Sequence, residues 1–319
     1  MEAIRSAEHV VATKLESLRE FQRDVSEELS ALASGHVDRS NGILTVLETN
    51  HEQYPAQKIT RAWIESKPDS LDEVVNTATF AEPNFPAVLQ KLHSDSAYTN
   101  SLSQLGEDLL AGENIIVITN HGEIKDIAVT LAAYYSAIKQ TGHINGREYD
   151  FQTNILLSKM VAHLGFYGES AVTILGKMCN RQYFSFPKTE SIRNSRIAPF
   201  VVDTYNKGLR RAIKSRFSDG GNLFAIAPSG TVDKPSGDDP NQLTLATVGT
   251  GTVEMLTSRS TKVLPVAIWS QDNQFIFEPL GIPRHMRDET DIHDTMNDIA
   301  NVLNVLVRQK EFKYDRPSP

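Results

Sequence analysis

The stretch NIIVITNHGEIKD, residues 114–126, sets an apolar run directly before a polar turn. Ile115–Thr119 consists of β-branched residues only, which is typical of a buried strand. The turn that follows contains His121, and a helical pattern of apolar residues resumes at Asp126. A strand, a turn and a helix in this order predict one unit of an α/β fold.

Short β-rich runs and amphipathic segments alternate over the remainder of the chain. The expected strands are Ile115–Thr119, Val172–Leu175, Leu223–Ala227, Val263–Ile268 and Phe275–Phe277. The expected helices are Asp126–Lys139, Asn154–Leu164, Pro199–Phe217, Leu243–Ser258 and Asp291–Gln309. This alternation predicts a mainly parallel sheet flanked by helices on both faces. Sites in such folds lie beyond the carboxyl ends of the strands, where TNH (119–121) and PSGT (228–231) would both lie.

The first 80 residues have a different pattern, with helical spacing of apolar residues and no convincing strand. The expected helical segments are Ala3–Ala33, Gly42–Thr49, Pro55–Glu65 and Ser70–Thr79. Pro83 and Pro86 then interrupt the pattern. We therefore expect a small N-terminal helical domain over residues 1–80 and an α/β domain over residues 81–319. A helical extension with no role of its own is an equally good interpretation of the first part.

Composition narrows the class of protein. The chain has 319 residues, of which 40% are hydrophobic and 23% charged, as in soluble globular proteins. A net charge of −8 argues against general binding of nucleic acid. Cys179 is the one cysteine, so no disulfide can form within the chain. With neither a signal-peptide pattern nor a long apolar run, the sequence predicts a cytosolic protein with at most peripheral membrane contact.

The pattern His-x4-Asp occurs twice, at His121 with Asp126 and at His293 with Asp298. The second pair lies in an expected helix, where residues five apart point about 140° away from each other. We therefore assign His293 and Asp298 a structural role. A turn separates His121 from Asp126, so the carboxylate can fold back toward the imidazole.

Four blocks of sequence resemble the soluble, plastid-type glycerol-3-phosphate acyltransferases, which belong to the His-x4-Asp glycerolipid acyltransferases. The blocks, in the order that the family shows, are TNHGEIKD (119–126), TILGKMCN (173–180), FAIAPSGTVDKP (224–235) and KVLPVAIW (262–269). Together they span most of residues 114–270. A helical N-terminal domain is also a property of that soluble type.

The resemblance implies transfer of a fatty acyl group from a thioester to a hydroxyl group. His121 would be the general base that takes the proton of the acceptor hydroxyl, and Asp126 would hold the imidazole. Backbone N–H groups at the Gly122 turn or at a helix start would stabilise the oxyanion. The implied reaction needs no metal and no bound cofactor.

The blocks that hold the acceptor phosphate in the family are only partly matched. Lys177 and Lys234 remain from four expected cations, and Val232 stands where the family has an arginine. The expected substrate-binding residues are Lys177, Ser229, Gly230, Thr231, Lys234, Arg193 and Arg196. Lysine is a point charge where arginine binds phosphate bidentately, so either another arginine substitutes or the acceptor differs.

A basic stripe marks the expected helix over residues 199–217. Its members recur at helical spacing on one face: Lys207, Arg210, Arg211 and Lys214. The stripe is either a solvated face or a docking surface for an acyl carrier protein or anionic lipid headgroups.

The expectation that follows is a glycerol-3-phosphate 1-O-acyltransferase that uses acyl carrier protein or coenzyme A thioesters. Three alternatives stay open: acylation of lysophosphatidate or another alcohol, a serine hydrolase using Ser229, and a non-catalytic lipid-binding protein.

Overall fold

The computed structural model describes residues 35–38, 43–48, 59–61, 63–68, 70–158, 175–185, 199–228, 233–236, 239–245, 248, 250–270, 274–307 and 310–314. The chain divides into two compact units. The first contains Met1–Glu65, Leu157–Ile174 and Gln182–Arg211, and the second contains Ser66–Leu156, Leu175–Arg181 and Ala212–Pro319.

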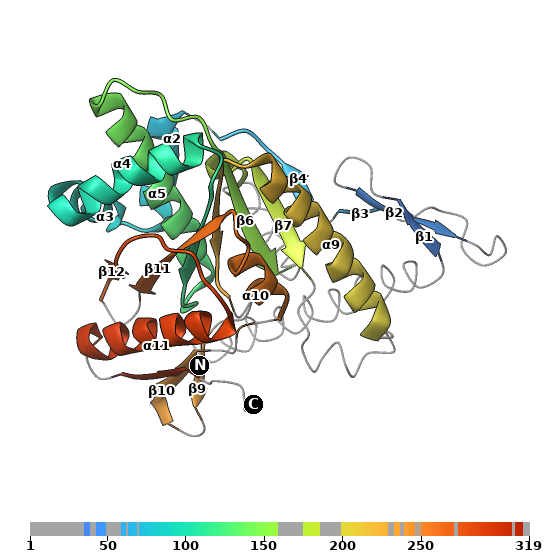
Figure 1. Cartoon of the computed structure of the whole chain (residues 1–319). Coiled ribbons are helices and arrows are strands. Elements are labelled where there is room, and N and C mark those ends of the chain that lie inside the picture. Colours follow the sequence, from blue (N-terminus) through green and yellow to red (C-terminus); the bar gives the residue numbers. More distant parts are fainter. Residues whose placement is uncertain are drawn as a thin grey trace, which may run out of the picture. The chain divides into compact units, whose positions relative to one another are not determined.

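A mostly parallel sheet forms the centre of the second unit (Figure 1). Its strands follow the order β12 (Ile276–Pro279), β11 (Thr261–Trp269), β5 (Asn114–Thr119), β8 (Asn222–Ile226) and β6 (Gln152–Ser158). β11, β5, β8 and β6 are parallel, and β12 is antiparallel to β11. The fold is therefore α/β, as the alternation of strands and helices predicts.

The sheet is covered by helices, which explains why its strands lack a polar face. Every residue of β5 and β8 is buried. Three helices pack on α5 (Ile124–Ile144): α2 (Leu71–Ala81), α3 (Phe85–Ser94) and α4 (Ser96–Leu110). Figure 1 shows these helices gathered around α5. α11 (Glu289–Leu306) packs on β11 and also contacts α10 (Thr250–Leu256).

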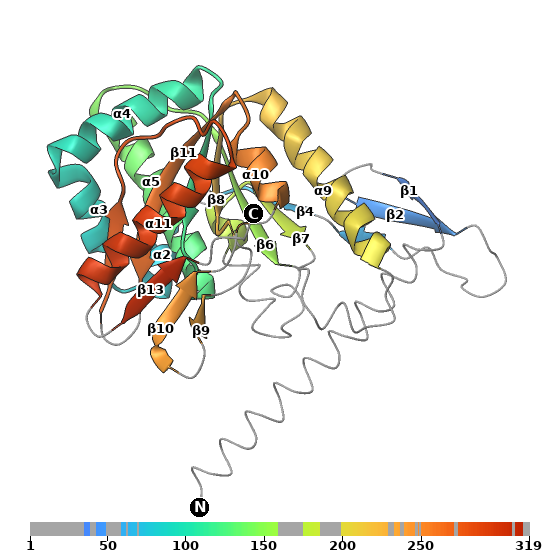
Figure 2. The same cartoon turned by 60° about the horizontal axis from the view of Figure 1, so that its bottom comes forward.

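A small second sheet in the same unit has the strand order β13 (Glu311–Tyr314), β10 (Asp239–Leu245) and β9 (Lys234–Ser236). β13 is parallel to β10, and β9 is antiparallel to β10. α11 contacts β13, as Figure 2 shows. Phe312 of β13 meets Trp269 of β11 edge to face, with 5.2 Å between the ring centroids. These contacts join the small sheet to the central one.

In the first unit, an antiparallel sheet consists of β1 (Gly35–Asp38), β2 (Ile43–Glu48) and β3 (Ile59–Arg61). β4 (Trp63–Glu65) and β7 (Arg181–Ser185) are neighbouring strands. α9 (Pro199–Asp219) begins in the first unit and ends in the second.

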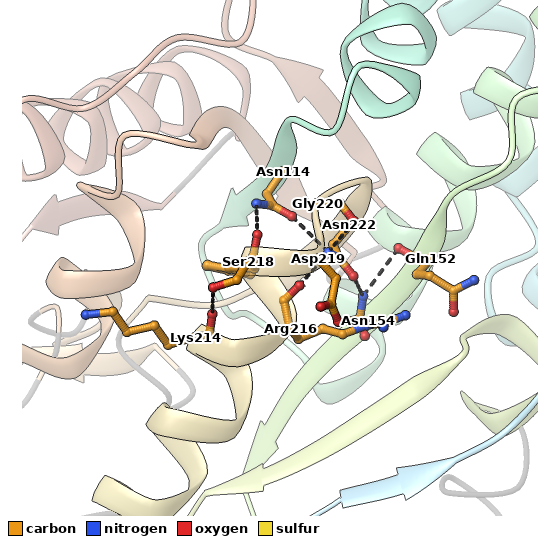
Figure 3. Close-up of polar contacts among 10 residues, drawn as sticks. Asn114, Gln152, Asn154, Lys214, Arg216, Ser218, Asp219, Gly220 and Asn222 are labelled. Carbon is orange, nitrogen blue, oxygen red and sulfur yellow. Dashed lines mark hydrogen bonds and ion pairs between the residues drawn. The ribbon is translucent and has the colours of Figure 1, made fainter.

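Buried asparagines fix the amino ends of three parallel strands (Figure 3). Asn222 Nδ2 donates to Asn114 Oδ1 at 2.9 Å, and Asn154 Nδ2 donates to Asn222 Oδ1 at 3.3 Å. Asn114 and Asn222 also bind backbone carbonyls of Phe217, Arg216 and Gly220, at the end of α9. The network therefore ties β5, β8 and β6 to the helix that precedes β8.

Several sequence expectations were wrong where short apolar runs fit either period. Gly42–Thr49 and Pro55–Glu65 were expected as helices, but β2, β3 and β4 are strands. Asn154–Leu164 was expected as a helix, but it begins within β6. Runs of four to eight apolar residues do not distinguish a buried strand from a helix, and β-branched residues such as Ile43 and Val46 favour the strand.

Two further boundaries differ. The expected helix Leu243–Ser258 begins instead as strand β10, and helix α10 starts only at Thr250. Leu175 is helical rather than part of a strand, whereas residues 172–174 lie outside the described residues. The expected N-terminal helix Ala3–Ala33 also lies outside them, so the division of the chain at residue 80 stays a prediction. The helix expected at Ser70–Thr79 is confirmed by α2.

Candidate functional site

His121 lies at the carboxyl edge of the central sheet. β5 ends at Thr119, which pairs with Val266 of β11, and α5 begins at Ile124. The side chain of His121 is buried. A buried imidazole at this edge, next to the amino terminus of a 21-residue helix, has the position that catalytic groups occupy in α/β folds.

The hydrogen bond of the imidazole fixes its tautomer. His121 Nδ1 lies 3.0 Å from the carbonyl oxygen of Glu123. Because a carbonyl only accepts, Nδ1 carries the proton and Nε2 keeps its lone pair. Burial lowers the pKa of His121 below 6.5, although the Glu123 carbonyl acts in the opposite direction. His121 is therefore neutral at pH 7, with a basic nitrogen at Nε2.

Asp126 organises the turn between the strand and α5. Its Oδ2 accepts the backbone N–H of Glu123 at 2.6 Å, and its Oδ1 accepts Ser270 Oγ at 3.1 Å. Neither oxygen bonds the imidazole of His121, so the two residues are linked through the backbone of Glu123. The expectation that the carboxylate itself would contact the imidazole does not match this geometry.

Burial raises the pKa of Asp126 to about 7, against the lowering effect of its hydrogen bonds from Glu123 and Ser270. Both an ionised and a protonated carboxyl can accept the Glu123 N–H. Asp126 can therefore hold the turn in either protonation state.

Two residues that the sequence analysis did not select fix the main chain of the site. Asn120 pairs with the backbone of Ile268: its Nδ2 donates to the carbonyl at 2.8 Å, and its Oδ1 accepts the N–H at 2.9 Å. Asp233 Oδ2 accepts the backbone N–H of His121 at 3.0 Å, and the Asp233 N–H donates to the His121 carbonyl at 2.8 Å. Both residues lie inside the blocks TNHGEIKD and FAIAPSGTVDKP, next to residues that were selected.

Gly122 leaves little room for a side chain beside His121. A Cβ on Gly122 would lie 3.3 Å from Asp126 Oδ2 and 3.5 Å from the Trp269 ring. Trp269 is buried and supports the turn from the end of β11. Any larger residue at position 122 would therefore press on Asp126.

An ion-pair cluster lies next to the turn, in the first turn of α5. Lys125 Nζ is 3.0 Å from Glu82 Oε2 and 3.3 Å from Glu123 Oε2. Burial acts to raise the pKa of Glu82, but hydrogen bonds from Lys125 and Asn84 outweigh it and hold the pKa below its ordinary value. The cluster joins the end of α2 to the start of α5.

Lys177 lies near the amino edge of the sheet, opposite to the carboxyl edge where His121 lies. Three residues along, the side chain of Asn180 accepts both the N–H and Oγ1 of Thr153, each at 2.9 Å. Thr153 pairs with Leu223, which pairs with Ile115 at the amino end of β5. His121 is six residues further along, or about 20 Å at 3.3 Å per residue. The structure therefore does not bring the exposed Lys177 to His121.

Lys234, in contrast, is one residue from Asp233, at the start of β9. Its backbone is therefore close to that of His121. The remaining expected substrate-binding residues lie outside the described residues: Ser229, Gly230, Thr231, Arg193 and Arg196.

The basic stripe lies on α9, and the opposite face of that helix is apolar as expected. Leu209, Ile213 and Phe217 are buried. Of the basic residues, Arg211 and Lys214 are exposed and Arg210 is half-buried, while the side chain of Lys207 is outside the described part. The possible docking role of this stripe stays a prediction.

The second His-x4-Asp pair lies within helix α11, as expected, and its structural role stays a prediction. His293 is buried in α11, with Nδ1 2.5 Å from Tyr314 Oη and Nε2 3.3 Å from Glu289 Oε1. Asp298 is exposed.

Cys179 is buried. Its thiol donates to the Leu175 carbonyl, and burial raises the pKa of the thiol to about 12. A thiol in this state is a poor nucleophile.

Within the part of the chain that the structure describes, no helix is both long and apolar enough to cross a bilayer. The same residues contain no group of three or more His, Cys, Asp or Glu side chains placed to bind a metal ion. No protein-family model and no curated protein matches this chain.

Proposed function

We propose that this protein is an acyltransferase that moves a fatty acyl group from a thioester to the hydroxyl of glycerol 3-phosphate. One observation carries the proposal: His121 is neutral, its Nδ1–H is held by the Glu123 carbonyl, and Nε2 is left as the basic nitrogen. A base in this state can take a proton from an alcohol at neutral pH. The resemblance of four sequence blocks to the plastid-type enzymes supports the choice of acyl transfer.

In the proposed reaction, Nε2 of His121 accepts the hydroxyl proton while the acceptor oxygen attacks the thioester carbonyl carbon. The tetrahedral intermediate collapses as the carbon–sulfur bond breaks. The thiolate leaves with the proton that His121 holds, which returns the imidazole to its neutral form. The products are an ester and a free thiol.

The amino terminus of α5 supports the charge balance of this step. α5 begins at Ile124, three residues after His121, and its positive dipole end favours negative charge nearby. An oxyanion that forms at this edge would be stabilised by backbone N–H groups there.

For the acceptor, Lys234 is the cation that we propose at the phosphate. Its neighbour Asp233 is hydrogen-bonded to the backbone of His121, so the backbone of Lys234 lies near the proposed base. The donor would be a fatty acyl thioester of acyl carrier protein or of coenzyme A. A cytosolic enzyme with peripheral membrane contact would deliver its lipid product to the bilayer.

Release of free thiol from an acyl thioester, measured with and without glycerol 3-phosphate, tests the proposal. Release that requires the acceptor supports a transferase. Release without any acceptor indicates a hydrolase, and no release with either type of donor contradicts catalysis.

A further inference from the structure

Asp233 is hydrogen-bonded to two residues that follow the end of β5. Its Oδ2 accepts the His121 N–H at 3.0 Å and Asn120 Nδ2 at 3.4 Å. Its own N–H donates to the His121 carbonyl at 2.8 Å. Both polar groups of the His121 backbone are therefore bound by one residue that is 112 positions away in the chain.

The surroundings make these bonds hard to replace. Asp233 is 8% exposed, His121 is 9% exposed and Asn120 is 1% exposed. Water has little access, so loss of the carboxylate would leave the His121 N–H buried without its acceptor. Asn120 would keep its pairing with Ile268. Of these two partners, His121 would therefore be the one more affected by removing the carboxylate.

The imidazole and the backbone of His121 are held by different partners. The Glu123 carbonyl binds Nδ1 of the imidazole, and Asp126 of α5 binds the Glu123 N–H. Asp233, directly before β9, binds the backbone of His121 instead. A shift of the His121 main chain moves Nδ1 away from the Glu123 carbonyl. The tautomer of the ring then depends on the backbone bonds to Asp233.

We propose that Asp233 is a positioning residue, which fixes the backbone of His121 and thereby keeps the proton on Nδ1 and the lone pair on Nε2. Its link to catalysis rests on the proposed function. Asp233 is adjacent to Lys234, which we propose as the binding residue for the acceptor phosphate. Asp233 therefore also links that segment to His121.

The first experiment reads the tautomer without any activity. Nitrogen-15 spectra of the histidine rings, with His121 assigned by its absence in His121→Ala, should show Nδ1–H in the wild-type protein. In Asp233→Ala, His121 should shift toward the Nε2–H form that free imidazoles favour. Asp233→Asn keeps one acceptor oxygen and should stay close to the wild type.

The second experiment measures turnover. A displacement of about 1 Å at a reacting group costs roughly 100-fold. Asp233→Ala should therefore lower kcat by about 10- to 100-fold, with the KM for the thioester little changed. Should that variant not fold, Asp233→Glu makes the same test, because its extra methylene moves the carboxylate away from the His121 N–H.

Asp108→Ala is the matched control. Asp108 is also 8% exposed and hydrogen-bonded, but it binds Lys262 at the amino end of β11. Its loss should reduce stability and leave the His121 tautomer unchanged. An Asp233→Ala protein that keeps both the Nδ1–H tautomer and the wild-type kcat would overturn the inference. A tautomer shift in a protein without acyl transfer would support the positioning role and contradict only the proposed function.

Discussion

His121 Nδ1 and the carbonyl oxygen of Glu123 lie 3.0 Å apart, two residues from each other along the chain. This contact places the ring proton on Nδ1 and leaves Nε2 as the basic nitrogen, which is the state that the proposed general base requires. Asp126 supports it indirectly, by accepting the Glu123 N–H at 2.6 Å. The His-x4-Asp spacing therefore fits two residues that share a backbone partner.

The pH dependence of catalysis should reflect the lowered pKa of His121. A general base must be neutral, so kcat/KM falls as pH drops through the pKa of the free enzyme. Because burial brings that pKa below 6.5, kcat/KM at pH 6.5 should be more than half of its plateau value. A pH–rate profile that is half-maximal at or above pH 6.5 would contradict the neutral, desolvated imidazole.

Asp126→Asn should change how stability depends on pH. The folded pKa of Asp126, about 7, lies above its ordinary value of 3.8, so protonation favours the folded state. The contribution is fully present below about pH 4 and is lost as pH rises through 7. The unfolding free energy of the wild type, minus that of Asp126→Asn, should therefore decrease as pH rises over this range, by about 4 kcal/mol at most.

Denaturant unfolding at a series of pH values measures this difference. The acid limb of the rate profile should stay in place in Asp126→Asn, because that limb belongs to His121. Parallel stability curves across pH 4–8 would show that the carboxyl does not titrate as its burial implies.

Asn222→Ala should destabilise the protein without affecting turnover per folded molecule. Asn222 Nδ2 donates to Asn114 Oδ1 and to two backbone carbonyls (Figure 3). These bonds lie at the amino edge of the sheet, whereas His121 follows the carboxyl end of β5. Loss of this buried network should cost about 2–4 kcal/mol in unfolding free energy. A variant with wild-type stability would mean that these bonds are dispensable, and a loss of kcat would mean that the amino edge affects the site.

The two lysines that the sequence singles out should behave differently as alanine variants. Lys234→Ala should raise the KM for glycerol 3-phosphate by roughly 10- to 100-fold, the value of one charge-assisted hydrogen bond. Lys177→Ala should change nothing, because Lys177 lies near the amino end of β6. Glycerol is the control acceptor, since it has no phosphate and should be affected by neither substitution. Equal losses for both acceptors would show that Lys234 has a structural role.

Sequence reasoning worked where one pattern dominated. The run Ile115–Thr119 is β-branched throughout, which favours a buried strand, and Glu289–Leu306 carries an apolar stripe long enough to define a helix. It failed at Gln152–Ser158, where a short apolar run fits both periods and only the neighbouring strand β8 decides.

The site was predictable in part for a similar reason. His121 and Asp126 are near each other in the chain, so their spacing alone places them on one turn. Asp233 and Ser270 bind the same turn, but each is more than 100 positions from its partner in the chain. No local sequence pattern encodes such contacts. Lys177 appeared suitable because its block follows the family order, but the Asn180–Thr153 hydrogen bonds hold that block at the opposite edge.

The most direct test of the account is formation of the ester product by a His121→Ala protein, with His285→Ala as the matched control. His285 also has Nδ1 close to a carbonyl, 2.9 Å from Thr261, but at the amino end of β11. With an acyl thioester and glycerol 3-phosphate, acylated glycerol 3-phosphate measured by mass spectrometry should fall by roughly 100- to 10,000-fold in His121→Ala. His285→Ala should match the wild type. Undiminished ester formation by a folded His121→Ala protein would contradict His121 as the base.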